Sequence, residues 1–141
     1  MKTTNFYKTV NSIGGVALST SLYAGNSVEK CVMTRSQLVV EGWQASNDGD
    51  MLKIYTPVGF EIMGAKVVGG KSGSAGTVQV YNGGTAITDA ISASGDHKVR
   101  YANDLDQDQT EFNASDDDLY LKHATASGAK MTVIMDIIPE N

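Results

Sequence analysis

Apolar and polar residues alternate with a period of two along much of the chain, as in β-strands that bury one face. The alternation is regular over residues 16–22. We expect further strands at residues 38–43, 51–56, 60–68, 77–81, 85–91, 97–101, 118–123 and 130–138. Short strands at this spacing, joined by turns such as Asn82-Gly83 and without a long helical pattern, predict an all-β fold. The predicted architecture is an antiparallel β-sandwich or jelly-roll-like domain.

The same pattern divides the chain into two regions. Residues 38–141 carry the succession of strands, and we expect them to form the β-sandwich domain. Residues 1–37 are rich in serine, threonine and glycine, and we expect an extended N-terminal arm or an edge-strand segment there. Residues 60–68 are apolar on both faces of the expected strand, which favours a central position in a sheet.

The charge of the chain argues against a nucleic-acid partner. The net charge is −5 and the isoelectric point is about 4.8, so the surface as a whole repels a phosphate backbone. Residues 1–43 depart from this balance with a local charge of +2, which leaves −7 for the remainder. No segment approaches the roughly 18 consecutive apolar residues of a membrane-spanning helix, so we expect no membrane partner.

The residues that carry chemistry do not have the spacing of a catalytic or cofactor site. Residues 69–72 (Gly-Gly-Lys-Ser) are similar to the end of a phosphate-binding loop, but Ala65 stands where that motif needs glycine. His97 and His123 are not spaced as a metal-binding pair. Cys31 is the single cysteine, and we expect a buried apolar role for it rather than a reactive thiol. We therefore expect no cofactor, no metal and no enzymatic activity.

Calcium binding is an open alternative for the acidic segment at residues 104–118. Asp104, Asp106 and Asp108 have the first three ligand spacings of a calcium loop. Gln109, however, stands at the position of that motif's glycine. A solvated acidic loop is the first interpretation of the segment.

Aromatic and basic residues near the N-terminus are the candidates for partner binding. Trp43 is the sole tryptophan and is interpreted first as a core anchor. Its alternative role is an exposed ring that stacks on a sugar or contacts a partner. Phe6 and Tyr7 lie between Lys2 and Lys8, and would give the arm apolar groups to bury in a neighbouring protein with an acidic surface.

Four segments together form a pattern of a hairpin, an acidic-apolar strand and a last strand that ends in proline. They are residues 76–81 (Gly-Thr-Val-Gln-Val-Tyr), 85–91 (Thr-Ala-Ile-Thr-Asp-Ala-Ile), 118–121 (Asp-Leu-Tyr-Leu) and 128–139. In this pattern the chain resembles the small decoration (cement) proteins of tailed-bacteriophage capsids, over about residues 51–139. The resemblance implies a β-rich virion protein, made in the host cytoplasm, that binds the outer capsid surface between major capsid subunits as a trimer or dimer.

Two functions therefore compete. The first is a non-enzymatic virion structural protein that binds the outer capsid surface and stabilises contacts between capsid subunits. Each copy would bury apolar area across a seam, at roughly 25 cal/mol per Å². The second is a carbohydrate-binding or adhesion module in which Trp43 or a tyrosine stacks on a sugar. A major capsid gene beside this gene would support the first, and specific binding on a glycan array would support the second.

Deletion of residues 2–12 tests the arm hypothesis. The shortened protein should stay folded, because the predicted strands lie outside the deleted segment, and its melting temperature should change little. It should, however, lose occupancy on its assembly, because Phe6 and Tyr7 are removed. If the deletion unfolds the isolated protein in a thermal melt, the segment is part of the core and the arm hypothesis is wrong.

Overall fold

The computed structural model describes residues 15–22, 26–45, 49–69, 74–94, 99–113, 118–124 and 130–139. These residues form thirteen strands and one short 3₁₀ helix, η1 (Gln107–Gln109). The strands of the first half are β1 (Val16–Ala17), β2 (Ser19–Leu22), β3 (Lys30–Met33), β4 (Gln37–Gln44), β5 (Met51–Tyr55), β6 (Phe60–Val68) and β7 (Ser74–Asn82). Those of the second half are β8 (Thr85–Ala86), β9 (Ile91–Ser94), β10 (Val99–Tyr101), β11 (Glu111–Phe112), β12 (Leu119–Ala124) and β13 (Lys130–Pro139).

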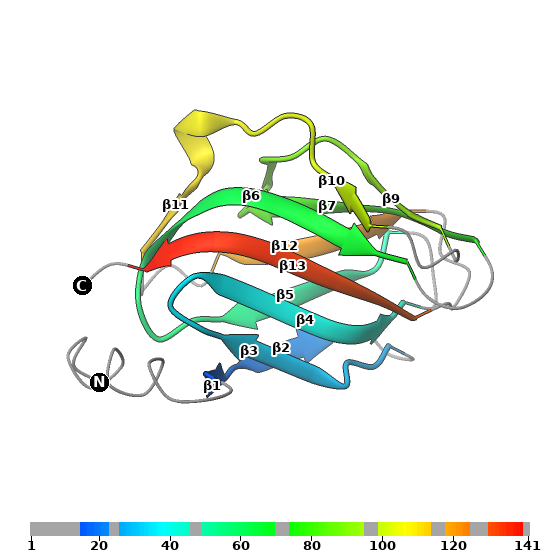
Figure 1. The fold of residues 1–141 in the computed structure, drawn as a ribbon, viewed down its shortest axis with the longest axis horizontal. Coiled ribbons are helices and arrows are strands. Elements are labelled where there is room, and N and C mark those ends of the chain that lie inside the picture. Colours follow the sequence, from blue (N-terminus) through cyan, green and yellow to red (C-terminus); the bar gives the residue numbers. More distant parts are fainter. Residues whose placement is uncertain are drawn as a thin grey trace.

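The strands form two antiparallel sheets that pack face to face (Figure 1). The larger sheet has the order β1-β3-β4-β13-β6-β10, and β11 also pairs with β6. The smaller sheet has the order β2-β5-β12-β7-β8, and β9 also pairs with β7. The predicted all-β sandwich is therefore confirmed, and β6 has the interior position expected for residues 60–68.

The pairing from β4 onward follows the logic of a jelly roll, in which the chain folds back on itself from both ends. The first strand, β4, pairs with the last strand, β13, and β5 pairs with β12. Inside these pairs β6 meets β10 and β11, and β7 meets β8 and β9. The links from β4 to β5, from β6 to β7 and from β12 to β13 each pass from one sheet to the other. This double winding brings both sheets together around one core.

Three short strands extend the sandwich at its N-terminal edge. The expected strand at residues 16–22 is divided between the sheets, because β1 pairs with β3 whereas β2 pairs with β5. Strand β3, which had not been predicted, pairs with β4. Strand β1 ends the larger sheet and β2 ends the smaller one, whereas β3 lies between β1 and β4. Residues 1–14 lie outside the described part of the chain.

Alternating inward side chains from both sheets form the core. In β12 the burial alternates along the strand, with Leu119, Leu121 and His123 buried and the intervening residues partly exposed. In β13 the same alternation runs through four buried apolar side chains. Phe60 and Phe112, paired across β6 and β11, stack with ring centroids 4.9 Å apart. The largest fully buried side chains are Trp43, Phe60, Met33, Leu38, Leu52, Ile54, Ile62, Ile87, Ile91, Leu119 and Leu121.

A bulge in β4 turns Trp43 into this core. Val40 pairs with Val133 and Trp43 with Met131, so two residues of β4 face a single residue of β13. Gly42 lies in this bulge with a φ of 67°, a left-handed conformation that suits glycine. Without the extra residue, strict alternation would place Trp43 on the outer face, opposite to Val40. The bulge therefore decides on which side of the sheet the tryptophan lies.

Replacing Gly42 by alanine should lower the free energy of unfolding by about 1–3 kcal/mol, the cost of a strained left-handed residue. The added Cβ would also meet the Glu29 carboxylate at 2.5 Å, so that side chain would have to move. Gly84→Ala is the matched control, because nothing lies within 4 Å of its added Cβ. Urea denaturation of both variants measures the difference. Equal stabilities would contradict the role given to the bulge.

Candidate functional site

Among the described residues, the strands present two outer faces to solvent, because the core fills the space between the sheets. In β13 Val133 and Met135 are buried, so the neighbouring Ile134 points to the opposite, outer side. In β6 Val67 is buried, and Lys66 is outward for the same reason. The side chains that can contact a partner are therefore those at every second position of each strand.

One row of outward side chains crosses five strands of the larger sheet. The strand register pairs Val32 with Val39, Val39 with Ile134, Ile134 with Lys66, and Lys66 with Tyr101. Four of these five residues are apolar or aromatic, and of these four only Val32 is buried, at 8% exposure. In an antiparallel sheet that faces water, polar residues normally occupy the outer positions. The larger sheet is thus apolar on both faces along this row.

The most exposed large hydrophobic side chains lie on the same sheet. Among the described residues six such side chains are exposed, and four of them belong to β6, β10 and β13: Met63 at 53%, Val99 at 46%, Tyr101 at 62% and Ile138 at 56%. Val99 pairs directly with the half-buried Val68. The outward apolar and aromatic side chains of β4, β6, β10 and β13 are together called the apolar face: Val39, Met63, Val68, Val99, Tyr101, Ile134 and Ile138.

Shallow hollows border the apolar face at both ends of the row. One, of about 210 Å³, is lined by Lys30, Val32, Thr34, Val39 and Glu41. Another, of about 370 Å³, lies between β9 and β10 and has Val99, Arg100 and Tyr101 in its wall. Both are open depressions with mixed walls, which suits contact with a protein surface better than enclosure of a small molecule.

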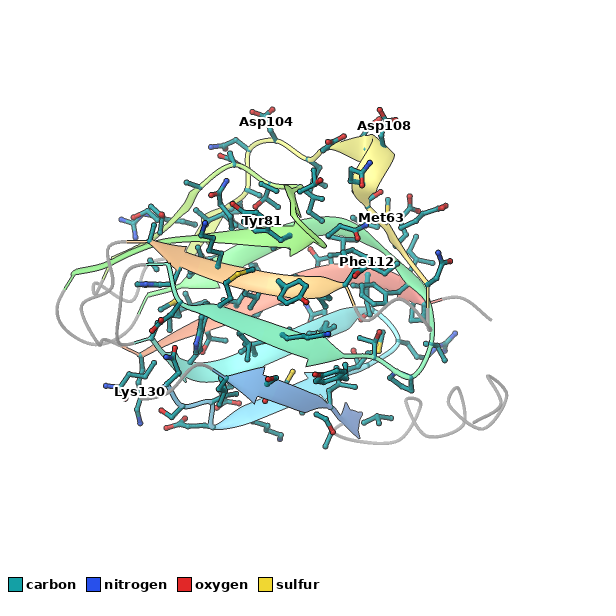
Figure 2. The ribbon with its side chains drawn as sticks, turned by 180° about the vertical axis from the view of Figure 1, so that it is seen from behind. Met63, Tyr81, Asp104, Asp108, Phe112 and Lys130 are labelled. Carbon is teal, nitrogen blue, oxygen red and sulfur yellow. The ribbon has the colours of Figure 1, made fainter. Side chains whose placement is uncertain are left out.

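The outer face of the smaller sheet carries tyrosine and lysine instead. Tyr120 pairs with Lys53 on one side and with Tyr81 on the other. The Lys53 ammonium lies 5.1 Å from the ring centroid of Tyr55 and 5.6 Å from that of Tyr120. The Lys122 ammonium lies 5.7 Å from that of Tyr81, which Figure 2 labels on this side of the molecule. These five residues are called the tyrosine face.

The expectation that Trp43 contacts a partner is wrong, because its side chain has no exposed surface. Its ring meets that of His123 edge to face, with centroids 5.8 Å apart, and its Nε1 donates a hydrogen bond to Asn26 Oδ1 at 3.4 Å. The first interpretation, a core anchor, is confirmed. The other four candidates for partner binding, Lys2, Phe6, Tyr7 and Lys8, lie outside the described residues.

The acidic segment stands on a loop at one edge of the sandwich, where Figure 2 labels Asp104 and Asp108. Asp106 begins the 3₁₀ helix, and its Oδ1 accepts a hydrogen bond from the Asp108 backbone N–H at 3.2 Å. Asp89 Oδ1 accepts the backbone N–H groups of Asn103 and Asp104. Two of these carboxylates therefore shape the loop. Within the described ranges no group of three or more His, Cys, Asp or Glu side chains is placed to hold a metal ion.

Comparison with known proteins gives no family. The chain matches no protein-family model and no curated protein. Among solved structures it is similar to a chain described as "Carbohydrate binding module family29", with a TM-score of 0.37 and 11% sequence identity, over 88% of this chain and 90% of that chain. A likeness at this level carries no argument about function. In the described part of the chain, no helix has the length and apolarity needed to cross a membrane.

Neither outer face was predicted from the sequence. The signal for the tyrosine face is present, because Lys53 and Tyr55 alternate with buried residues in one strand, as do Tyr120 and Lys122 in another. This alternation is also the ordinary pattern of a half-exposed strand, so the sequence does not show that the two strands lie side by side. That information comes only from the pairing of β5 with β12.

Cys31 is buried at 6% exposure, and this burial raises the pKa of its thiol to about 12. In the folded protein Cys31 should therefore resist a thiol-specific reagent such as DTNB at pH 8, and it should react fully once urea unfolds the chain.

The raised pKa of Cys31 also predicts that the free energy of unfolding falls as pH rises from about 9 towards 12, because only the unfolded chain then loses the thiol proton.

Thr85→Cys is the matched control for the DTNB experiment, because Thr85 is exposed and the variant adds a thiol at the surface. The folded variant should react with one equivalent of DTNB. Rapid labelling of Cys31 in the folded wild-type protein would contradict its burial.

Proposed function

We propose that this chain is a non-enzymatic structural protein of a virion, which binds the outer capsid surface through its apolar face and stabilises contacts between capsid subunits. The observation that carries the proposal is the concentration of exposed hydrophobic side chains on β6, β10 and β13. Exposed apolar side chains gathered on one face of a folded protein mark interaction surfaces. The resemblance to capsid decoration proteins supplies the nature of the partner.

The energetics favour a partner that binds many copies. Burial of apolar surface contributes roughly 25 cal/mol per Å², but association also costs translational and rotational freedom. A single flat face of this size therefore gives modest affinity on its own. On a capsid, each copy would lie across the contact between two subunits. Separating the subunits would then expose the apolar area buried by that copy, which raises the free energy of separation. The same stabilisation would be repeated at every such contact of the shell.

The surroundings of the apolar face resemble the rim of a protein interface. Lys30 pairs with Glu41 across β3 and β4 at one border. Asp136 lies within the face, between Ile134 and Ile138 on β13, and accepts a hydrogen bond from Gln37 at 3.4 Å. Lys66, within the row, lies over the Tyr101 ring with its ammonium 5.9 Å from the centroid. An apolar centre with polar groups around it is the common arrangement of specific protein contacts.

The competing function, a carbohydrate-binding module, loses one of its two stacking residues because Trp43 is buried. A tyrosine could still stack on a sugar, and Tyr55, Tyr81 and Tyr120 are the candidates for this role. A glycan site built on these tyrosines lies on the smaller sheet and is independent of the apolar face. Glycan binding is therefore compatible with attachment to a capsid.

Replacing Val99 and Tyr101 by glutamate should weaken capsid binding, because two charges would then have to be desolvated in the contact. Both side chains are about half exposed or more, so the melting temperature should change little. Sequencing of the neighbouring genes identifies the capsid protein to test, and co-sedimentation with shells assembled from it measures binding. A decrease of at least tenfold in affinity is expected.

The control is Thr85→Glu, which adds a charge at an exposed position of the smaller sheet, away from the apolar face. It should bind like the wild type. Equal binding by the control and by the Val99 and Tyr101 variant would place the contact elsewhere. If no capsid gene lies near this gene and the wild-type chain does not sediment with capsid shells, the virion proposal is wrong.

A further inference from the structure

We propose that Asn82 is a site of spontaneous deamidation, and that loss of its side-chain amide releases the loop of residues 103–113 from the sandwich. Two observations carry the proposal. One is the sequence Asn82-Gly83, and the other is the pair of hydrogen bonds that the Asn82 amide donates to this loop. Neither involves the apolar face, so the inference does not depend on the proposed function.

Asn82 connects the two sheets at one end of the sandwich. It is the last residue of β7 in the smaller sheet. Val80 is buried, so Asn82, two positions further along the strand, points to the same inner side. From there its Nδ2 donates hydrogen bonds to the Gln109 carbonyl at 3.0 Å and to the Glu111 carbonyl at 3.1 Å. Glu111 belongs to β11, which pairs with β6 of the larger sheet.

The connection requires an amide nitrogen. Two carbonyl oxygens face the side chain, so the atom that meets them must carry two hydrogens, as Nδ2 does. A carboxylate at the same position could donate to neither carbonyl, and its charge would lie close to both oxygens. Asp108 and Glu111 on the loop, and Asp118, whose carboxyl lies beside Gly83, would repel this charge as well. Conversion of Asn82 to aspartate therefore turns an attractive contact into a repulsive one.

An asparagine followed by glycine is the pair that loses its amide most readily, because glycine has no side chain to hinder the attack. Asn82 is the one asparagine of the chain that glycine follows. The Gly83 backbone nitrogen bonds to Asn82 Cγ and gives up its proton, and the Cγ–Nδ2 bond breaks, so that Nδ2 leaves as ammonia. Water then opens the cyclic imide. Addition at the side-chain carbonyl gives aspartate, and addition at the main-chain carbonyl gives isoaspartate, in which Cβ becomes part of the main chain.

The folded structure controls the rate of this reaction. The Gly83 N–H donates to the Asp118 carbonyl at 2.8 Å, and this bond and the two amide bonds must break before the nitrogen can reach Cγ. The next residue, Gly84, is exposed, so a local opening of the turn admits water. We expect deamidation to proceed slowly from this open state. The change is then permanent, because the product cannot form the two bonds again.

Loss of the amide should loosen the loop while the rest of the sandwich stays folded. The loop keeps backbone hydrogen bonds of its own, from the Asp106 N–H to the Ile87 carbonyl and from the Ile62 N–H to the Thr110 carbonyl. These are the bonds that should open more often once the amide is gone. The loop also lines a hollow of about 300 Å³ together with Met63, so its release would change the surface beside the apolar face.

Hydrogen–deuterium exchange of the Asn82→Asp variant tests the release. The N–H groups of Asp106 and Gln109 should exchange faster than in the wild type by about tenfold or more, because the loop opens more often, whereas the centre of β13 should not change. Gln107→Glu is the matched control, because Gln107 is exposed and the variant adds the same charge to the same loop without removing the Asn82 amide. Asn82→Ala removes both hydrogen bonds without adding a charge, and it decides the outcome if the aspartate variant does not fold. If neither Asn82 variant exchanges faster in the loop than Gln107→Glu, the proposal is wrong.

Ageing of the wild-type protein tests the modification itself. The folded chain is kept in mildly alkaline buffer, digested, and analysed by mass spectrometry for aspartate and isoaspartate at each asparagine. Residue 82 should convert ahead of Asn103, which is exposed but is followed by Asp104. The converted fraction should show the fast loop exchange of Asn82→Asp. If residue 82 keeps its amide at least as long as Asn103 does, Asn82 is not a modification site and the proposal is overturned.

Discussion

The packing of the two sheets against each other is the constraint on which the rest of the structure depends. Every strand that crosses the sandwich must give its inward positions to one shared layer of apolar side chains, and Leu38, Ile62, Leu121 and Val133 do so from four different strands. In a chain of this size that layer has to supply most of the stability. The binding surfaces are therefore left to the outward positions of the strands.

The outward positions of the two sheets differ in chemistry. On the larger sheet they form a row from Val39 through Ile134 and Lys66 to Tyr101, in which the lysine is the one polar residue. On the smaller sheet they carry tyrosines with lysines held over the rings, as for Lys53 and Tyr120. The core separates the two faces, so a change of side chain on one face leaves the other in place.

Much of the fold follows from the period-two pattern, and the errors have local causes. Residues 51–55, 60–68 and 130–139 form strands close to their predicted bounds, because buried and exposed residues alternate there almost without interruption. The segment 85–91 was predicted as one strand, yet β8 ends at Ala86 and β9 begins only at Ile91. Thr88 explains part of this break, since its hydroxyl accepts the Val80 backbone N–H in place of a regular strand partner.

The candidate sites were harder to predict than the strands. The side on which Trp43 lies depends on one extra residue at Gly42, and the sequence does not show which positions of a partner strand face it. The apolar face and the tyrosine face each combine residues from three or more strands that are distant in sequence. Alternation gives the orientation of each side chain, but only the strand order shows that Tyr81, Tyr120 and Lys53 are neighbours.

The central claim is that the outer surface of the larger sheet is the one that attaches this protein to its partner. Hydroxyl-radical footprinting of the chain, free in solution and bound to assembled capsid shells, tests it most directly. Met63, Tyr101 and Ile138 should be oxidised readily in the free protein, because each is more than half exposed, and protected in the assembly. Tyr55 and Tyr81 should keep their reactivity. Protection of these two tyrosines, with no change at Met63, Tyr101 and Ile138, would contradict the claim.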